Sequence, residues 1–324
     1  MANNGNSNLH MSKSGKQDEF YTPISMIEDE LKYYKKHFEG KIVFCNCDDP
    51  AESNFWKYFQ LNFYKLGLKK LISTHFEESK SSYRLEITGG EDENGQMRIP
   101  GYVTTPLVKN GDFRSPECVE ILKEADIVVT NPPFSLFREY IELLMSYNKK
   151  FLIIGNINNI TYNEIMPLYR TGKIWLGRHS GHFWFRVPDY YEEKQTDFKI
   201  DENGVKWRRM GNICWFTNLD YKERYEDIVL FQKYDPAIYP KYDNFDAIHI
   251  KECKDIPCDY YGLMGVPITF CAKHNPKQFE YLGIDKENTD KHERFKLMQK
   301  DGKLKTQYAR VLIRRVPKNE NRDE

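Results

Sequence analysis

A regular alternation of short apolar runs with segments of helical periodicity most constrains the fold of this chain. Short, largely apolar segments of this kind are typical of strands buried on both faces of a sheet. They occur at Lys41–Cys45, Lys70–Thr74, Ala125–Thr130 and Phe151–Gly155. Helical spacing is found at residues 24–38, 55–66, 115–124 and 137–147. Strands that alternate with helices predict a mostly parallel, Rossmann-like α/β sheet with helices on both faces.

The second half of the chain is less regular. After Asn156, aromatic residues recur every few positions, and Gly and Pro are scattered among them. Alternating apolar residues predict a hairpin or insertion within 79–110. Further strands are predicted at 173–177, 212–217 and 264–270.

The tetrapeptide Asn131-Pro132-Pro133-Phe134 directly follows one predicted strand, and Cys45-Asn46-Cys47-Asp48 follows another. In a doubly wound sheet, ligands bind beyond the carboxyl ends of the strands, near the point where strand order reverses. Both segments are therefore expected to open into one crevice. The two prolines fix the backbone after Asn131 and remove two N–H donors, which leaves a rigid loop of carbonyl oxygens and one side-chain amide.

A rigid cluster of acceptors followed by an aromatic ring suits a planar substrate with an exocyclic amine. Such an amine is a poor nucleophile because its lone pair is delocalised into the ring. If the Asn131 side-chain oxygen and the Pro132 carbonyl accept its two protons, the nitrogen is drawn toward tetrahedral geometry and its lone pair is directed at an electrophile. Phe134 would stack on the substrate ring. The alternative is an ordinary proline turn, with Phe134 in the core.

The charge of the whole chain excludes two classes of protein. Lys and Arg together number 48, as do Asp and Glu, so the chain is neither a uniformly basic nucleic-acid coat nor a polybasic membrane module. No apolar run reaches the roughly 18 residues that span a bilayer, and the N-terminus lacks the apolar stretch of a signal peptide. We expect a cytoplasmic protein without membrane contact, whose seven cysteines are reduced.

Charge is nevertheless uneven along the chain. Residues 291–318 contain ten Lys and Arg against Glu293 and Asp301, which indicates either a phosphate-contacting stripe or a solvated segment. Basic and aromatic residues are also interleaved near Arg178 and at 207–209. The candidate DNA contacts from these segments are Arg178, Trp207, Arg208, Arg209, Arg310, Arg314 and Arg315.

The spacing of Cys253, Cys258, Cys271 and His274 is compatible with a zinc site. Cys271, however, ends a predicted apolar strand, so we interpret it as a core residue. No metal is expected.

Seven segments together resemble one family. They are Asp18–Thr22, Val43–Pro50, Gly111–Ser115, Asp126–Phe137, Phe151–Asn156, Cys214–Leu219 and Gly265–Phe270. This set is similar to the EcoRI-type adenine-specific DNA methyltransferases and spans nearly the whole chain. Most S-adenosylmethionine enzymes have a Gly-rich turn after the first strand, whereas this chain has Cys-Asn-Cys-Asp-Asp-Pro there, as the EcoRI type does.

The resemblance implies transfer of a methyl group from S-adenosylmethionine to N6 of an adenine flipped out of double-stranded DNA, in a restriction-modification system with GAATTC as the leading target. It assigns catalysis to Asn131, Pro132, Pro133 and Phe134. It assigns cofactor binding to Phe20, Tyr21, Thr22, Cys45, Asn46, Asp48, Asp112 and Phe113, with Glu77 or Glu78 near the ribose.

The same resemblance implies a class I methyltransferase sheet and a division of the chain. We expect a flexible tail at 1–17, a catalytic and cofactor-binding domain at 18–170, and a target-recognition region at 171–324 that also supplies the last sheet strands. A monomer is expected, because a methyltransferase modifies one strand at a time.

Two alternative functions use the same residues. An amino-methyltransferase acting on RNA or on a protein glutamine needs the same pair of acceptors. A DNA-binding protein that has lost catalysis is the other alternative, although the intact Asn131, Asp112 and Asp48 argue against it.

Overall fold

The computed structural model describes residues 20–47, 49–77, 82–90, 101–289, 291–299 and 301–317. It divides the chain into two compact units. The first comprises the residues up to Asn159 together with His179–Tyr221, and the second comprises Ile160–Arg178 together with the residues from Lys222 onward. Strands from beyond residue 170 complete the sheet of the first unit.

Four parallel strands form the centre of the sheet in the first unit: β1 (Ile42–Cys45), β2 (Lys70–Thr74), β5 (Ile127–Thr130) and β6 (Lys150–Asn156). Their order is β2-β1-β5-β6, with all three pairings parallel. β1 and β2 lie on one side of the β1/β5 pairing and β5 and β6 on the other, so strand order reverses between β1 and β5. The predicted α/β class and the four predicted strands are confirmed.

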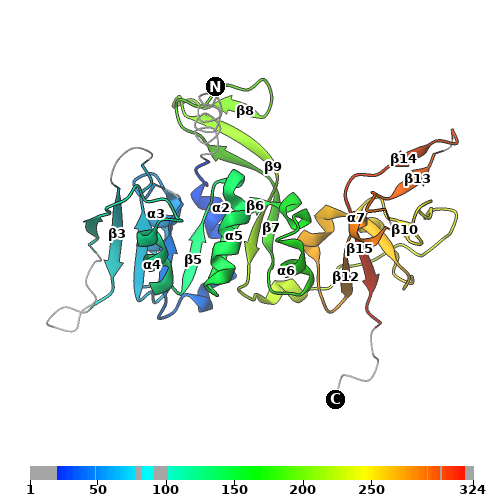
Figure 1. Ribbon diagram of the computed structural model, residues 1–324, viewed down its shortest axis with the longest axis horizontal. Helices are drawn as coiled ribbons and strands as arrows, with labels where there is room; N and C mark the ends of the chain where they lie inside the picture. The colour runs from blue at the N-terminus through cyan, green and yellow to red at the C-terminus, as the bar shows by residue number, and fades with distance from the viewer. Residues whose placement is uncertain are drawn as a thin grey trace, which may run out of the picture. The chain divides into compact units, whose positions relative to one another are not determined.

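Antiparallel strands extend the sheet at both edges. β3 (Tyr83–Thr88) and β4 (Val103–Pro106) pair next to β2, which confirms antiparallel pairing within 79–110. On the other edge, β9 (Lys206–Thr217) pairs with β6, and β7 (Trp175–Arg186) pairs with β9. The short β8 (Phe198–Ile200) also pairs with β9, and this hairpin projects beyond the sheet (Figure 1). β7 and β9 are much longer than the strands predicted at 173–177 and 212–217.

Helices cover this sheet where the spacing predicted them. They are α2 (Ile24–Leu31), α3 (Asn54–Leu61), α4 (Pro116–Glu124) and α5 (Phe137–Ser146). Ser53 and Ser115 cap α3 and α4, each by accepting backbone N–H bonds through its hydroxyl. The helix predicted over 24–38 is shorter than expected. It ends at Leu31, and a 3-10 turn (η1, Lys35–His37) follows, which still buries Tyr34 and Phe38.

A close contact joins the sheet to α5. An added Cβ at Gly155 on β6 would lie 2.5 Å from the ring of Phe137, the first residue of α5. Glycine at this position therefore lets α5 lie directly on the sheet. Because α5 begins just after Phe134, this contact also limits where the Asn131–Phe134 loop can lie.

The second unit contains a smaller sheet with the order β10-β11-β15-β12. Its strands are β10 (Ile248–His249), β11 (Met264–Pro267), β12 (Phe279–Ile284) and β15 (Arg310–Arg315), and a ribbon is formed by β13 (Lys296–Met298) and β14 (Leu304–Thr306). The short helices α6 (Met166–Arg170) and α7 (Asp285–Asn288) and the 3-10 turns η3 (Ile157–Thr161), η4 (Lys222–Tyr225) and η5 (Cys253–Asp255) complete the named elements. The strand predicted at 264–270 ends at Pro267, where the chain turns into η6 (Ile268–Lys273).

Two histidines of the second unit are held neutral. Burial, and to a smaller degree the nearby Arg310, lower the pKa of His249 from 6.5 to about 4. Burial also lowers the pKa of His274 to about 4, although its bond to the Phe279 carbonyl opposes the shift. His249 contacts the hydroxyl of Tyr242 at 2.9 Å, so neither imidazole is left without a polar neighbour.

These shifts predict acid sensitivity. Between pH 6.5 and 4 the unfolded chain takes up protons on His249 and His274 while the folded chain does not, so the free energy of unfolding should fall as pH falls through this window and be flat above it. The slope should reach about 1.4 kcal/mol per pH unit for each histidine. Urea unfolding at a series of pH values measures it, and His274→Gln should remove about half of the slope. An unchanged slope in that variant would contradict the assignment.

Candidate active site

Three parallel strands are tied together at their carboxyl ends. The hydroxyl of Thr130, the last residue of β5, accepts a bond of 3.2 Å from the backbone N–H of Cys47, which follows β1. On β2, the Ser73 hydroxyl donates to the Cys45 carbonyl at 2.7 Å. The two segments predicted to share a crevice are therefore neighbours at the point where strand order reverses. Asp48 lies outside the described residues.

The Asn131–Phe134 loop leaves β5 with its first side chain buried. Asn131 is 7% exposed, and its Nδ2 donates to the backbone carbonyl of Phe20 at 2.7 Å. Pro133 begins a 3-10 turn (η2, Phe134–Leu136) that leads directly into α5. The Phe134 ring stacks on the Phe20 ring, with centroids 5.6 Å apart and planes at 24°. Phe134 is half-buried and contacts a segment that is distant in sequence.

The Phe20–Thr22 segment is fixed from two sides. Tyr21 forms an antiparallel bridge with Arg186 on β7, with N–H···O bonds of 2.8 and 3.2 Å. On the other side, the Asn54 side chain at the start of α3 donates to the Thr22 carbonyl at 2.8 Å. The Arg186 guanidinium also contacts the Glu52 carboxylate at 2.7 Å. From the sequence, Arg186 was considered only as a possible phosphate contact and Glu52 was missed, because nothing in their local pattern indicates that β7 returns to this segment.

Asn46 and Phe113 share a buried partner that sequence reasoning also missed. The Tyr140 hydroxyl on α5 donates to Asn46 Oδ1, and the Phe113 ring packs edge-on against Tyr140 at 5.0 Å. Burial raises the pKa of Tyr140 well above its ordinary value, so this hydroxyl stays protonated. The sequence signal that could have identified Tyr140 is its hydroxyl group on a helix face that is otherwise apolar. Tyr140 thus links the loop after β1 to the Asp112–Phe113 segment.

Asp112 is held by a neighbouring arginine. Its Oδ1 accepts from the backbone N–H of Arg114 at 2.8 Å and from Nε at 2.9 Å, and its Oδ2 accepts from Nη2 at 2.7 Å. Burial alone would raise the pKa of Asp112, but the bonds from Arg114 outweigh it and leave the pKa lowered. The carboxylate is therefore ionised at neutral pH and fixed in place, and any further donor must share it with Arg114.

Gly111 allows the Asp112 loop to reach the end of β2. Its φ of +81° lies in the left-handed region, and an added Cβ would collide with the carbonyl oxygen of His75. His75 in turn lies 3.7 Å from the Asp49 carboxylate in the loop after β1. Glu77 is present nearby through its backbone bond to Asn110, whereas Glu78 lies outside the described residues.

Two of the buried polar atoms in the Phe20–Thr22 segment and in the loop after β1 have no hydrogen-bond partner among the described residues. They are the Thr22 hydroxyl and Asn46 Nδ2, on side chains only 2% and 3% exposed. Buried polar groups are normally satisfied, so such a pair indicates a polar ligand. The residues present therefore fit a cofactor with hydrogen-bonding groups in this crevice.

The family model described as "Adenine-specific methyltransferase EcoRI" matches residues 8–316. The chain belongs to this family. The predicted resemblance, the enzyme class and the class I methyltransferase fold are confirmed. The match covers both units of this chain.

Three curated relatives carry the name Type II methyltransferase. M.EcoRI of Escherichia coli is 48% identical over 89% of this chain and 94% of its own length. M.MgeORF184P of Mycoplasma genitalium is 39% identical over 95% of this chain and 98% of its own length. M.MpnI of Mycoplasma pneumoniae is 38% identical over 85% and 84%. The search of solved structures gave no significant match.

The predicted DNA contacts of this EcoRI-family chain fall into separate places. Trp207, Arg208 and Arg209 lie on β9 in the projecting hairpin of the first unit, where Asp201 accepts from Trp207 Nε1 at 2.9 Å. Arg178 belongs to the second unit and contacts Glu226 at 3.4 Å. Arg314 and Arg315 end β15 and are at least partly exposed.

The structure does not support one predicted DNA contact, Arg310. Its side chain is only 8% exposed, and its Nη1 donates to the Ile250 carbonyl at 3.3 Å. Because this guanidinium is bonded to a carbonyl inside the unit and does not line the surface hollow of that unit, the structure does not support the prediction of Arg310 as a DNA contact. It stabilises the interior of the second unit instead.

The cysteine and histidine set at 253–274 shows no metal geometry. Within the described ranges, no group of three or more His, Cys, Asp or Glu side chains is placed to hold a metal ion. His274 is engaged by the Phe279 carbonyl at 2.9 Å and by the Tyr169 hydroxyl at 3.1 Å. The described part of the chain also has no helix long and apolar enough to cross a membrane.

Gly111→Ala tests whether the Asp112 loop of this EcoRI-family site depends on its glycine. The added methyl must displace the His75 carbonyl and strain a left-handed backbone, so we expect a loss of about 1–3 kcal/mol in the free energy of unfolding. Methyl-transfer activity should fall with it, because Asp112 and Phe113 move. Urea denaturation and a labelled-methyl assay measure both. Gly101→Ala, where nothing lies within 4 Å, is the control, and equal behaviour of the two variants would contradict the prediction.

Proposed function

We propose that this protein transfers a methyl group from S-adenosylmethionine to N6 of an adenine extruded from double-stranded DNA, with GAATTC as the target. One observation carries the proposal. The buried Asn131, followed by two prolines and a half-buried Phe134, stands at the strand-order reversal between β1 and β5. Membership of an adenine-specific family and relatives named Type II methyltransferases support the choice of substrate.

The orientation of the Asn131 amide supports its role as an acceptor. Its Nδ2 is committed to the Phe20 carbonyl at 2.7 Å, so the oxygen and nitrogen of the amide cannot exchange places. In the proposed reaction, the Asn131 oxygen and the Pro132 carbonyl accept the two protons of the adenine amine. This draws the nitrogen toward tetrahedral geometry and directs its lone pair. Phe134 stacks on the base and holds its plane.

The cofactor, when bound, supplies an electrophilic methyl group on a sulfonium. The residues proposed to hold it are Phe20, Tyr21, Thr22, Cys45, Asn46, Asp48, Asp112 and Phe113. The buried Thr22 hydroxyl and Asn46 Nδ2 are available for its polar groups. The side chains of this chain supply orientation and acceptors, and the extra amine proton leaves to solvent after transfer.

DNA contacts are proposed in both units. Trp207, Arg208 and Arg209 occupy a hairpin whose base is bonded to the Phe20–Thr22 segment through Arg186. A hairpin in this position projects from the same unit that holds the Asn131–Phe134 loop (Figure 1). We further propose that residues 171–324 contain the target-recognition region and that the protein acts in the cell interior as a monomer.

The sharpest test of the proposal is Asn131→Ala. Expression of the wild-type chain in a methylation-free host should place N6-methyladenine at one sequence motif, read by single-molecule sequencing of the host DNA. Asn131→Ala should lower methyl transfer by at least about 100-fold, because amine orientation is lost, while DNA binding remains.

Asn62→Ala is the matched control, since the Asn62 side chain bonds only within its own helix region, to the Tyr58 carbonyl at 2.9 Å. It should methylate normally. Full activity of Asn131→Ala would refute the role of Asn131, and a wild-type chain that leaves no modified adenine would favour the inactive DNA-binding alternative. Methylated RNA or glutamine in its place would favour the other amino-methyltransferase alternative.

A further inference from the structure

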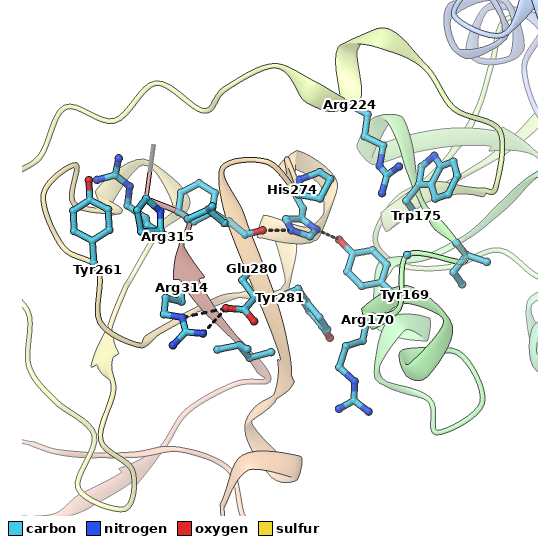
Figure 2. A pocket seen from close by; sticks show the side chains of 17 residues that line it. Tyr169, Arg170, Trp175, Arg224, Tyr261, His274, Glu280, Tyr281, Arg314 and Arg315 are labelled. Atoms are coloured by element: carbon cyan, nitrogen blue, oxygen red, sulfur yellow. Dashed lines mark hydrogen bonds and ion pairs between the residues drawn. The ribbon is translucent and has the colours of Figure 1, made fainter. Parts of the chain in front are cut away.

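The second unit contains a hollow of about 800 Å³ that no step of the proposed reaction uses (Figure 2). Its walls come from α6 and the segment after it as far as Trp175, from η4, from β12 and the residues just before it, and from the end of β15, with Tyr261 from the loop after Cys258. Aromatic and arginine side chains dominate the lining. They are Tyr169, Trp175, Tyr261, His274, Phe279 and Tyr281, with Arg170, Arg224, Arg314 and Arg315.

Two of these guanidinium groups lie on aromatic rings. Arg224 lies over Trp175 at 4.0 Å, and Arg315 lies over Tyr261 at 4.8 Å (Figure 2). Arg315 also donates to the Cys258 carbonyl. A stacked guanidinium keeps its N–H donors in the plane, where they can reach an oxyanion with two bonds. The rings thus fix the direction of the arginines in advance of a ligand.

The charge in the hollow is strongly positive. Arg314 is bound to Glu280 by bonds of 3.1 and 2.6 Å, and Glu280 is the carboxylate in the lining. Arg170 lies 3.6 Å from Glu287 of the same unit. His274 adds no charge, because burial lowers its pKa to about 4. Four guanidinium groups therefore face Glu280 in the lining and Glu287 beside Arg170, which leaves an excess of positive charge.

A buried hydroxyl adds a second indication of a ligand. Tyr281 on β12 lines the hollow and is only 7% exposed, and its hydroxyl has no hydrogen-bond partner among the described residues. An O–H donor in this position would be satisfied by an acceptor oxygen. The hollow therefore presents N–H and O–H donors to a ligand. Guanidinium groups already cover the faces of Trp175 and Tyr261, so these rings are not open for stacking by a ligand. The hollow fits an oxyanion better than it fits an aromatic ring.

We propose that this hollow binds the phosphodiester backbone of duplex DNA. The proposal rests on the proposed function, which makes DNA the substrate, and goes beyond it by naming the surface. Arg224, Arg314 and Arg315 contact phosphates, and the Tyr281 hydroxyl donates to a phosphate oxygen. Such contacts position the duplex and are independent of its sequence. Arg170 and Arg224 were not found from the sequence, because they lie outside the basic C-terminal segment.

The dependence of DNA affinity on salt tests this surface. For each phosphate contact that is lost, the slope of log K against log salt should become about 0.9 shallower. We expect this change for Arg224→Gln and for Arg315→Gln, about twice the change for the double variant, and equal weakening on target and scrambled duplexes. Arg224→Lys keeps the charge and should restore the slope.

Lys254→Gln is the control, since Lys254 is an exposed cation of the same unit outside the hollow, paired with Glu252 at 2.9 Å. Its slope should stay at the wild-type value. Wild-type slopes in both arginine variants, with unchanged thermal midpoints, would refute DNA binding at this hollow. That result would leave the proposed methyl-transfer reaction unaffected. A wild-type protein that binds DNA with the full slope but never methylates it would instead contradict the proposed reaction.

A different observation concerns Phe20, which was predicted to bind the cofactor. Its ring stacks on Phe134, the residue proposed to stack on the adenine, and is also enclosed by Phe185 at 6.0 Å and Tyr191 at 6.1 Å. Phe20 is only 8% exposed. Its backbone is fixed by the bonds of Tyr21 to Arg186, so the ring can leave by side-chain rotation while the chain stays in place.

We infer that the Phe20 ring occupies the position of the target base on Phe134 until the adenine enters. The main chain of Phe20 has a second role, because its carbonyl orients the Asn131 amide whether or not the ring is present. Entry of the base exchanges one stacked ring for another. Exposing a buried aromatic ring opposes that exchange by about tenfold or more in the extrusion equilibrium. This inference also rests on the proposed function.

Fluorescence of a duplex with 2-aminopurine at the target adenine tests the exchange. Phe20→Leu and then Phe20→Ala should raise the fluorescence and the affinity stepwise, about tenfold or more for Ala, because less side chain must be displaced. A duplex with an abasic target is the matched control, since no base displaces Phe20 there. Affinity for the 2-aminopurine duplex relative to the abasic duplex should rise; an unchanged or lower ratio would overturn the inference. If the wild-type protein methylates no adenine but this affinity ratio still rises in the Phe20 variants, only the proposed methyl-transfer reaction is contradicted.

Discussion

The parallel pairing of β1 with β5 is the constraint on which the rest of the site depends. Val43 faces Ile127 and Phe44 faces Val128, so both strands end at the same edge of the sheet. The neighbouring strands then run outward on opposite sides, which leaves the loop after each strand free to approach the other. The bond from Cys47 to the Thr130 hydroxyl shows that they do meet. Without this pairing, the Asn131–Phe134 loop would not lie beside the loop that follows β1.

A second requirement is met by segments far away in sequence. Asn131 is oriented by Phe20, 111 residues earlier, and the next residue, Tyr21, is bonded to Arg186 on β7. The sheet therefore has to be completed by β9 and β7 before the loop after β5 has its final environment. This explains why strands from the irregular half of the chain belong to the first compact unit. It also predicts that the proline loop alone, on a sheet lacking β7, would not fix the amide of Asn131.

Most of the sheet could be predicted because its central strands are apolar on both faces, and a run such as Ala125–Thr130 has no other way to be buried. The site was predictable only as a set of segments. Asn131 and Asn46 follow strands and were found, whereas Tyr140 and Arg186 act through contacts that no local pattern encodes. Phe20 was predicted as part of a cofactor segment, whereas the stacking of its ring on Phe134 is a long-range contact that no local pattern encodes. Periodicity also overextended the helix at 24–38 and the strand at 264–270, where turns intervene.

The arginines of β15 also show that a local sequence pattern does not predict the environment of each residue. β15 carries three arginines, and a count of the C-terminal segment treats them alike. Arg310 at its start is buried and bonded to a carbonyl, whereas Arg314 and Arg315 at its end line a cationic hollow. The difference arises because the first five positions of the strand pass from the interior of the second unit to its surface. Whole-chain neutrality is thus compatible with DNA binding, since a phosphate responds to a few guanidinium groups fixed on aromatic rings and not to the sum over 324 residues.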